Sequence, residues 1–206
     1  MPGQKLEADF FAGDTCSLAK KLLGCELVHE HEDGLTAGII VETEAYLRDD
    51  PACHAFNRRT VRTEPMYGPP GHAYIYLIYG MYQCFNVVSN AENIGEAVLI
   101  RALQPTQGID IMQIRRKLIK GKSGFTIKEK DLALKELCRG PGKLVKAMGI
   151  ERDEHNNTPL WTNPLYITAP TLGDFETVTT TRIGINAGAD LPYRYYVKNN
   201  IFVSKF

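Results

Sequence analysis

Short runs of apolar residues bounded by turn residues recur along this chain and predict a protein built mainly from β-strands. Residues 25–30 and 35–46 are two such segments, and Glu32-Asp33-Gly34 between them is typical of a tight turn. A second pair, 73–78 and 82–89, is joined only by Tyr79-Gly80-Met81, which predicts a β-hairpin. Further strands are predicted over residues 97–103, ended by Pro105, and near 165–168, 182–186 and 193–197.

Three segments have helical spacing instead. Asp14 is placed to cap a helix that ends near Leu23, and Pro141 is placed in the first turn of a helix that closes at Gly149. Residues 108–120 mix apolar with basic residues, as a surface helix does. The remaining stretches are predicted to be loops: a long one over 47–72, an exposed basic one over 121–130 and a polar one over 153–163.

Strands outnumber helices in this pattern and their connections are short, so the sheet should be largely antiparallel. We therefore expect an α+β fold in one compact domain that spans residues 1–206. A chain of this length is long enough to bury a core, and its 44% hydrophobic and 23% charged residues are ordinary for a globular protein.

The composition also limits which cellular compartment and which kinds of metal or cofactor site we expect. No run reaches the ~20 apolar residues that a membrane helix needs, and the N-terminus lacks the pattern of a signal peptide. The five cysteines are scattered and odd in number, which favours reduced thiols in an intracellular protein, cytoplasmic in a bacterium or nuclear in a eukaryote. Neither the cysteines nor the five histidines have metal-ligand spacing, so we expect no metal and no cofactor.

Charge is balanced overall but unevenly distributed. The 24 basic residues equal the 24 acidic ones, yet residues 1–57 hold 4 basic and 11 acidic residues, whereas residues 101–150 hold 12 basic and 4 acidic residues. Such a molecule can present one basic face to phosphates. Chance clustering of charged helix surfaces gives the same asymmetry, so charge alone does not identify a nucleic-acid-binding protein.

Tyrosines are concentrated in the predicted hairpin, where four of the chain's ten fall between Tyr74 and Tyr82. Tyr79 stands beside Gly80 at the turn, so its ring can project as a wedge, and the other three tyrosines can form a wall. Flat aromatic surfaces of this kind suit stackable ligands such as nucleobases. Alternate tyrosines are also good strand formers and can simply pack a core.

Polar residues interrupt three of the predicted strands. Glu42 and Glu44 share one face of their strand, where a carboxylate can activate water as a general base, although both also suit a solvated strand face. Asn86 and Arg101 interrupt two later strands, and an interior arginine requires an anion or a carboxylate. Together with Glu44 they would make a polar cavity with aromatic walls.

The remaining candidates lie in loops and at a helix start. His54 is in the long loop, although an isolated loop histidine is more often structural than catalytic. Arg58, Arg59 and Arg62 form a short basic cluster in the same loop. Lys143 lies in the glycine-rich segment that opens the last predicted helix, and helix N-termini bind phosphate. Both groups can contact phosphates, and both are equally compatible with plain surface charge.

These separate signals fall into the order of a known pattern. The blocks that carry it are Val41-Glu42-Thr43-Glu44-Ala45-Tyr46, then His54, Pro70–Tyr82, Asn86 and Leu99–Pro105. Asp9-Phe10-Phe11, Leu18–Gly24, Gly140–Leu144 and Arg182–Ile185 fit it as well. On these blocks the chain resembles the alkyladenine (3-methyladenine) DNA glycosylase family over about residues 6–203.

The resemblance implies a fold and an activity. The family fold is one α+β domain around a curved antiparallel sheet flanked by helices, with a protruding hairpin that inserts into DNA. Such an enzyme flips a damaged purine out of double-stranded DNA and hydrolyses the N-glycosidic bond without a metal, which leaves an abasic site. The implied substrates are 3-methyladenine and 7-methylguanine, with hypoxanthine and ethenoadenine as further candidates. Nothing in the sequence suggests an obligate oligomer, so we expect a monomer.

The same resemblance assigns a role to each site residue. Glu44 matches the carboxylate that activates the attacking water, and Arg101 matches the arginine that helps to hold this water. Tyr79 matches the residue that fills the gap in the base stack, and Asn86 matches the residue that discourages the 2-amino group of guanine. The residues that match those around the flipped base are Tyr46, His54 and Tyr76.

Two other functions would use the same residues. A non-catalytic nucleic-acid-binding module would explain the tyrosines and the basic segment, but it leaves Glu44 without a role. A nucleosidase that acts on free nucleosides would use Glu44 and a stacking pocket, but it needs no wedge at Tyr79. We expect the glycosylase, chiefly because of the resemblance.

Overall fold

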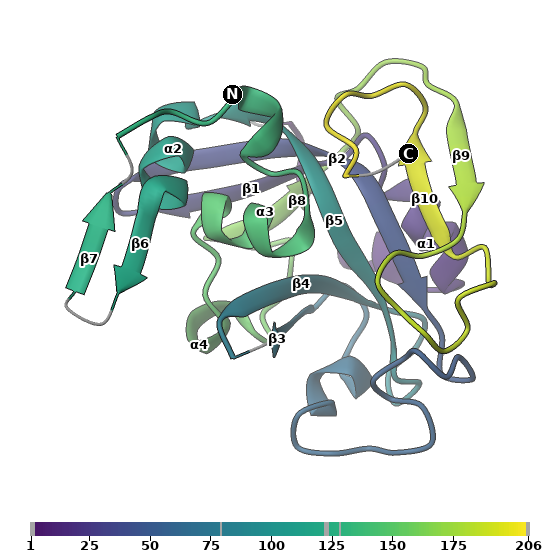
Figure 1. The fold of residues 1–206 in the computed structure, drawn as a ribbon. Coiled ribbons are helices and arrows are strands. Elements are labelled where there is room, and N and C mark those ends of the chain that lie inside the picture. The colour runs from purple at the N-terminus through teal and green to yellow at the C-terminus, as the bar shows by residue number, and fades with distance from the viewer. Residues whose placement is uncertain (1–2, 79, 122–123, 128, 205–206) are drawn as a thin grey trace.

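A long strand with partners on both edges lies at the centre of the computed structural model (Figure 1). Strand β2 (Gly34–Tyr46) pairs with β1 (Glu26–His31) along its first half and with β10 (Arg194–Val197) along its second half. Its other edge pairs with β5 (Glu96–Gln107), and all of these pairs are antiparallel. The residues that the structure describes are 3–78, 80–121, 124–127 and 129–204.

The other strands extend this centre on both sides. Strand β4 (Tyr82–Ser89) joins β5, and β3 (Ala73–Ile78) joins β4 in the predicted hairpin. The sheet order is β3-β4-β5-β2-β1-β8, with β8 (Leu165–Thr168) at the far edge and β9 (Thr177–Thr180) beside β10. Figure 1 shows β3 and β4 turned steeply against β2 and β5, so the sheet is curved. The predicted α+β fold with a curved, largely antiparallel sheet is confirmed.

Three helices pack against this sheet. Helix α1 (Thr15–Lys21) begins as predicted at Asp14, whose carboxylate accepts a hydrogen bond from the backbone N–H of Ser17, and it contacts β2, β5 and β10. Helix α3 (Pro141–Met148) contacts β4 and β5, and α2 (Ile109–Lys117) packs on α3. Shorter helical turns are Ala8–Phe11, Glu64–Tyr67, Leu134–Glu136 and α4 (Arg152–His155). Among the described residues, none of the helices has the length and apolarity to cross a membrane.

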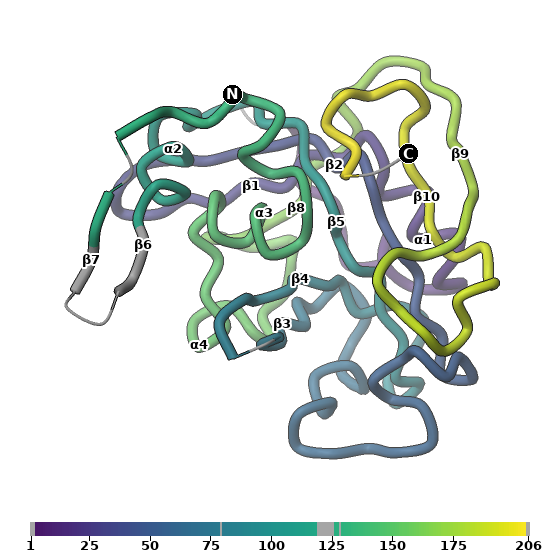
Figure 2. Tube along the Cα trace, in the orientation of Figure 1, coloured from purple at the N-terminus to yellow at the C-terminus, as the bar shows by residue number. Residues whose placement is uncertain are grey.

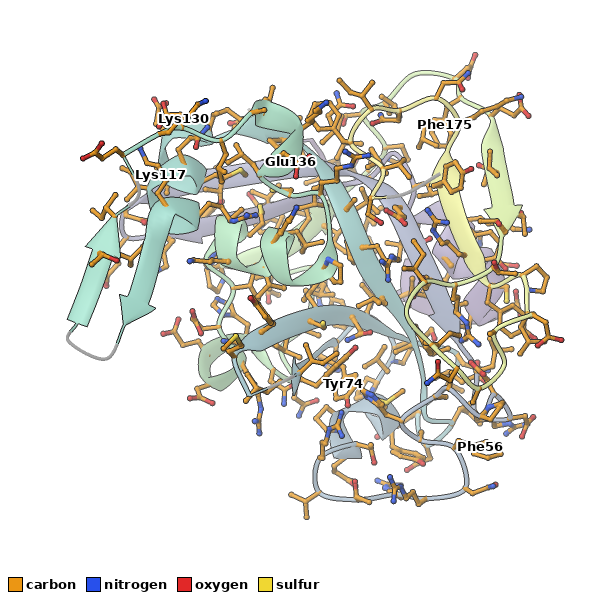
Figure 3. The ribbon with its side chains drawn as sticks, in the orientation of Figure 1. Phe56, Tyr74, Lys117, Lys130, Glu136 and Phe175 are labelled. Atoms are coloured by element: carbon orange, nitrogen blue, oxygen red, sulfur yellow. The ribbon has the colours of Figure 1, made fainter. Side chains whose placement is uncertain are left out.

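The long loop 47–72 is held to the sheet by a small hydrophobic core of its own. Cys53 and Met66 of the loop pack in this core with Tyr74 of β3 and with Ala97 of β5. Figure 3 shows Tyr74 on its strand next to the loop that carries Phe56. The loop therefore packs closely on the sheet. Tyr74 and Tyr76 of the suggested tyrosine wall lie at its base, whereas the third, Tyr82, is 52% exposed and lies outside this core.

Two strand predictions were wrong. The strand expected to end at Pro105 continues to Gln107. Strand β4 pairs only with the first part of β5, so the edge of β5 at Pro105 has no β4 partner. The missing N–H of the proline therefore breaks no hydrogen bond between these two strands. Residues 182–186 form no strand, because their polar groups bind to Asp50 and Glu44 instead of to a neighbouring strand.

Two loop predictions were wrong as well. The segment 121–130 contributes to a hairpin of β6 (Leu118–Gly121) and β7 (Gly124–Ile127), because its aromatic and β-branched residues favour a strand despite their basic neighbours. Residues 122–123 and 128 of that prediction lie outside the described residues. The segment 153–163 begins within the helical turn α4, whose first turn contains two acidic side chains that suit a helix N-terminus.

Substitution of one buried and one exposed isoleucine tests whether β5 lies in the core. Ile100 on β5 is completely buried, whereas Ile201 is 63% exposed. We expect Ile100→Ala to lower the free energy of unfolding by roughly 2–5 kcal/mol, because it removes buried methyl groups and leaves a cavity. Ile201→Ala is the matched control and should stay within about 0.5 kcal/mol of the parent. Urea unfolding followed by circular dichroism measures both, and equal losses would contradict this placement of β5.

Candidate active site

The site is built on a row of residues that lie side by side across four strands. Glu44 of β2 pairs with Leu99 of β5, Leu99 pairs with Asn86 of β4, and Asn86 pairs with Tyr74 of β3. Because the sheet is curved, these strands form the wall of a cavity of about 410 Å³, within the usual size range of small-molecule sites. Six of the predicted site residues line it: Tyr46, His54, Arg62, Tyr76, Asn86 and Arg101.

Glu44 lies directly behind this wall and is completely buried. Its Oε2 accepts a hydrogen bond from the Tyr46 hydroxyl at 2.8 Å, and its Oε1 accepts one from the backbone N–H of Ile183 at 2.9 Å. The Nη1 of Arg101 is 3.2 Å from the same Oε1. All three partners line the cavity. A carboxylate has about four acceptor positions, so one position on Oε2 is left for a further donor.

Glu42 has a different environment, although it lies only two residues away on the same strand. Its Oε1 accepts from the Nε of Arg194 at 2.7 Å and from the Nε of Arg101 at 3.2 Å. The backbone N–H of Ser204 donates to Oε2 at 2.7 Å. Glu42 is thus fully engaged in holding three segments of the chain together, and Arg101 bridges the two glutamates. Burial alone would lower the pKa of Arg101, but Glu44 and Glu42 raise it above its usual value, so the guanidinium stays charged.

The N–H of Ile183 is brought to Glu44 by residues 182–188, which we call the strap. Figure 2 shows the segment between β9 and β10 passing in front of the end of β2. Arg182 fixes the strap through a buried bidentate ion pair with Asp50 and a hydrogen bond from Nη1 to the carbonyl of Ala45 at 3.0 Å. Its guanidinium also lies 4.6 Å from the centroid of the Tyr46 ring. Sequence reasoning missed this contribution, because a backbone donor leaves no signal in the side-chain pattern.

His54 is held in one tautomer by its two partners. The Nη2 of Arg62 is 3.2 Å from His54 Nε2, and a guanidinium can only donate, so Nε2 is the acceptor. The proton is then on Nδ1, which donates to the Tyr74 hydroxyl at 3.0 Å. Burial, reinforced by Arg62 and Arg58, lowers the pKa of His54 to about 4, so the ring is neutral at physiological pH.

Two tyrosines give the cavity an aromatic surface. The Tyr76 ring lies 4.5 Å from the His54 ring at an interplanar angle of 81°, an edge-to-face contact. Burial raises the pKa of Tyr76, and burial together with the nearby charge of Glu44 raises the pKa of Tyr46. Both hydroxyls therefore remain protonated. Asn86 donates from Nδ2 to the carbonyl of Tyr74 at 2.9 Å, which fixes the orientation of its amide in the cavity wall.

The predicted phosphate-binding residues fall into two groups. Arg59 forms a bidentate ion pair with Glu64, and the Nζ of Lys143 is 2.9 Å from a carboxylate oxygen of Glu136, so both cations already have partners in the protein. Arg58 and Arg62 are exposed and border a second hollow beside the cavity. Their contacts with phosphate stay predictions, and Tyr79 lies outside the described residues. No group of three or more His, Cys, Asp or Glu side chains in the described part of the chain is placed to hold a metal ion.

Comparison with known proteins relates this geometry to one family. A family model described as methylpurine-DNA glycosylase matches residues 9–201. A protein of Carboxydothermus hydrogenoformans is 49% identical over 201 residues, which cover 97% of this chain and 98% of the relative. A relative from Methanoculleus marisnigri is 47% identical over the same shares, and one from Clostridium acetobutylicum is 45% identical over 97% of both chains. Each is named "Putative 3-methyladenine DNA glycosylase".

The low pKa of His54 predicts how acid affects the protein. The folded pKa of about 4 lies below the ordinary value of 6.5, so only the unfolded chain takes up a proton between these values. We expect the His54 contribution to stability to be complete above pH 6.5 and to decline as the pH falls toward 4. His29 is shifted in the same direction for the same reason, which is burial, so the two must be separated. An NMR titration of the histidine ring resonances measures each pKa, and a His54 midpoint near 6.5 would contradict the buried neutral ring.

Proposed function

Because this chain belongs to the methylpurine-DNA glycosylase family, whose members hydrolyse N-glycosidic bonds, we propose that its cavity receives a damaged purine flipped out of double-stranded DNA. One observation carries the proposal: a buried carboxylate, Glu44, is held by Tyr46, Arg101 and a backbone N–H at the wall of an aromatic cavity. Neither a simple binding module nor a stacking platform requires a carboxylate in that position.

Recognition of the base rests on charge and aromaticity. A purine alkylated at N3 or N7 is cationic, and the faces of Tyr76 and Tyr46 attract a cation. Flipping costs a few kcal/mol of stacking and pairing, and it costs least for a damaged base. Stacking on an aromatic side chain returns about 1–3 kcal/mol per base. Asn86 has a fixed amide in the wall, and this amide is suited to discourage the 2-amino group of guanine.

The chemical step requires a water molecule and stabilisation of positive charge. Cleavage of the glycosidic bond passes through an oxocarbenium-like state, in which the sugar becomes positive. The acceptor position left on Glu44 Oε2 can hold and orient the water, and the negative carboxylate stabilises the sugar cation. Arg101 holds Glu44 in place through the ion pair of 3.2 Å.

The wall of the cavity also suggests which lesions react fastest. Cationic 3-methyladenine and 7-methylguanine leave without protonation, whereas neutral hypoxanthine and ethenoadenine need a proton from an acid. No aspartate or glutamate is among the described residues that line the cavity, so we expect neutral lesions to react more slowly. No lysine is among these lining residues either, which supports hydrolysis to an abasic site without strand cleavage.

The hairpin of β3 and β4 is suited to enter the duplex. Its turn contains Gly80 with a φ of +69°, a conformation that glycine adopts without strain. Met81 next to it is 70% exposed, so an apolar side chain already projects from the tip. We propose that Tyr79 fills the gap left by the flipped base, that Arg58 and Arg62 contact phosphates, and that the protein acts as a monomer.

The catalytic assignment is tested by Glu44→Gln. The amide keeps the size of the side chain but cannot act as a base, so we expect single-turnover release of 3-methyladenine from methylated duplex DNA to fall by about 10²–10⁴. Binding of the same duplex, measured by fluorescence anisotropy, should be largely retained.

Glu176→Gln is the control for this substitution. Glu176 is exposed and pairs with Lys198, and its replacement should leave base release unchanged. If Glu44→Gln released the base at a near-normal rate, Glu44 would not be the group that activates water.

Replacement of Tyr79, the proposed wedge, distinguishes a DNA glycosylase from a nucleosidase. We expect Tyr79→Ser to slow base release from duplex DNA, because the flipped base can then return to its stack more easily. A free methylated nucleoside needs no flipping, so its hydrolysis would not respond to this change. Parallel assays of both substrates measure the difference, and an unchanged rate on duplex DNA would favour the nucleosidase.

A further inference from the structure

The base cavity is partly occupied by a side chain of the protein itself. Arg62 comes from the long loop, and its guanidinium reaches the two groups best suited to recognise a cationic purine. Its Nη2 is 3.2 Å from His54 Nε2, and its Cζ is 5.6 Å from the centroid of the Tyr76 ring. Arg62 and both of these partners line the cavity.

The chemistry of this contact resembles that of an alkylated base. A guanidinium is a planar, delocalised cation with N–H donors. An alkylated purine with an exocyclic amino group is also a planar, delocalised cation with N–H donors. His54 offers a neutral acceptor nitrogen and Tyr76 offers an aromatic face, and Arg62 uses both in the DNA-free protein.

We propose that Arg62 is an internal plug of the base cavity, which every base must displace before it can contact His54 and Tyr76. The inference rests on the proposed function for the identity of the ligand as a purine. Arg62 is well placed to leave, because it lies in an exposed part of the loop and has no carboxylate partner among the ion pairs of the described residues.

The plug raises the threshold for entry but does not choose between bases. Displacement costs the same free energy whichever base enters, because the same contacts of Arg62 are broken each time. Every base therefore binds more weakly by the same factor, and the ratio between the affinities of two bases is unchanged. Once displaced, the guanidinium is free to approach a phosphate of the DNA.

The plug is tested with a ligand that has no phosphate. The probe is free ethenoadenine base, whose own fluorescence reports stacking, titrated with the DNA-free protein. Arg62→Gln should bind it roughly two- to fivefold more tightly than the parent, which is what one exposed cation–π contact is worth. Arg48→Gln removes the same charge from the same loop, away from the cavity, and should bind the base like the parent.

The results distinguish this inference from the proposed function. Tighter binding by Arg62→Gln alone supports the plug. Unchanged or weaker binding by Arg62→Gln, equal tightening by Arg48→Gln, or no binding by any of the proteins overturns it. Release of 3-methyladenine from methylated duplex DNA by the parent is measured separately, and its absence would overturn the proposed function without affecting the result on free base.

Discussion

The buried charges around Arg101 are the constraint on which the rest of the structure depends. Two carboxylates, Glu42 and Glu44, are completely buried, and removal of charge from water is costly unless each charge is paired. Arg101 and Arg194 supply two positive charges, so the cluster is neutral overall. β2, β5 and β10 must be in register to bring these groups together.

The two buried glutamates also connect the early strand β2 to the last part of the chain. The N–H of Ile183 donates to Glu44 and the N–H of Ser204 donates to Glu42, although both donors come from the last part of the chain. Arg182 and Asp50 form a second buried ion pair, and this pair fixes the strap that carries Ile183. The carboxylate of Glu44 is therefore oriented by several distant segments of the chain and not by its own strand alone.

Sequence alone was enough for the parts of the fold with strong local signals. The hairpin around Gly80, the cap at Asp14 and the helix at Pro141 each follow from residue types that favour one conformation. The strap could not be predicted, because the alternation of Ile183 and Ile185 imitates a strand and the bond that matters comes from the main chain. Charge distribution was a weaker guide as well, since several cations of the basic segment bind to partners within the protein: Arg115 to Asp33, Lys117 to Asp131 and Lys143 to Glu136.

The small core under the long loop has a consequence for how such a protein can diverge. Met66 and Tyr74 belong to this core, Tyr76 packs against it, and all three also line the cavity, so replacing them alters the cavity and loosens the loop together. Cys84 and Leu99 line the cavity without belonging to that core. Asn86 and Ile185 are further positions of this kind, and a change of shape at any of them alters the cavity without loosening the loop.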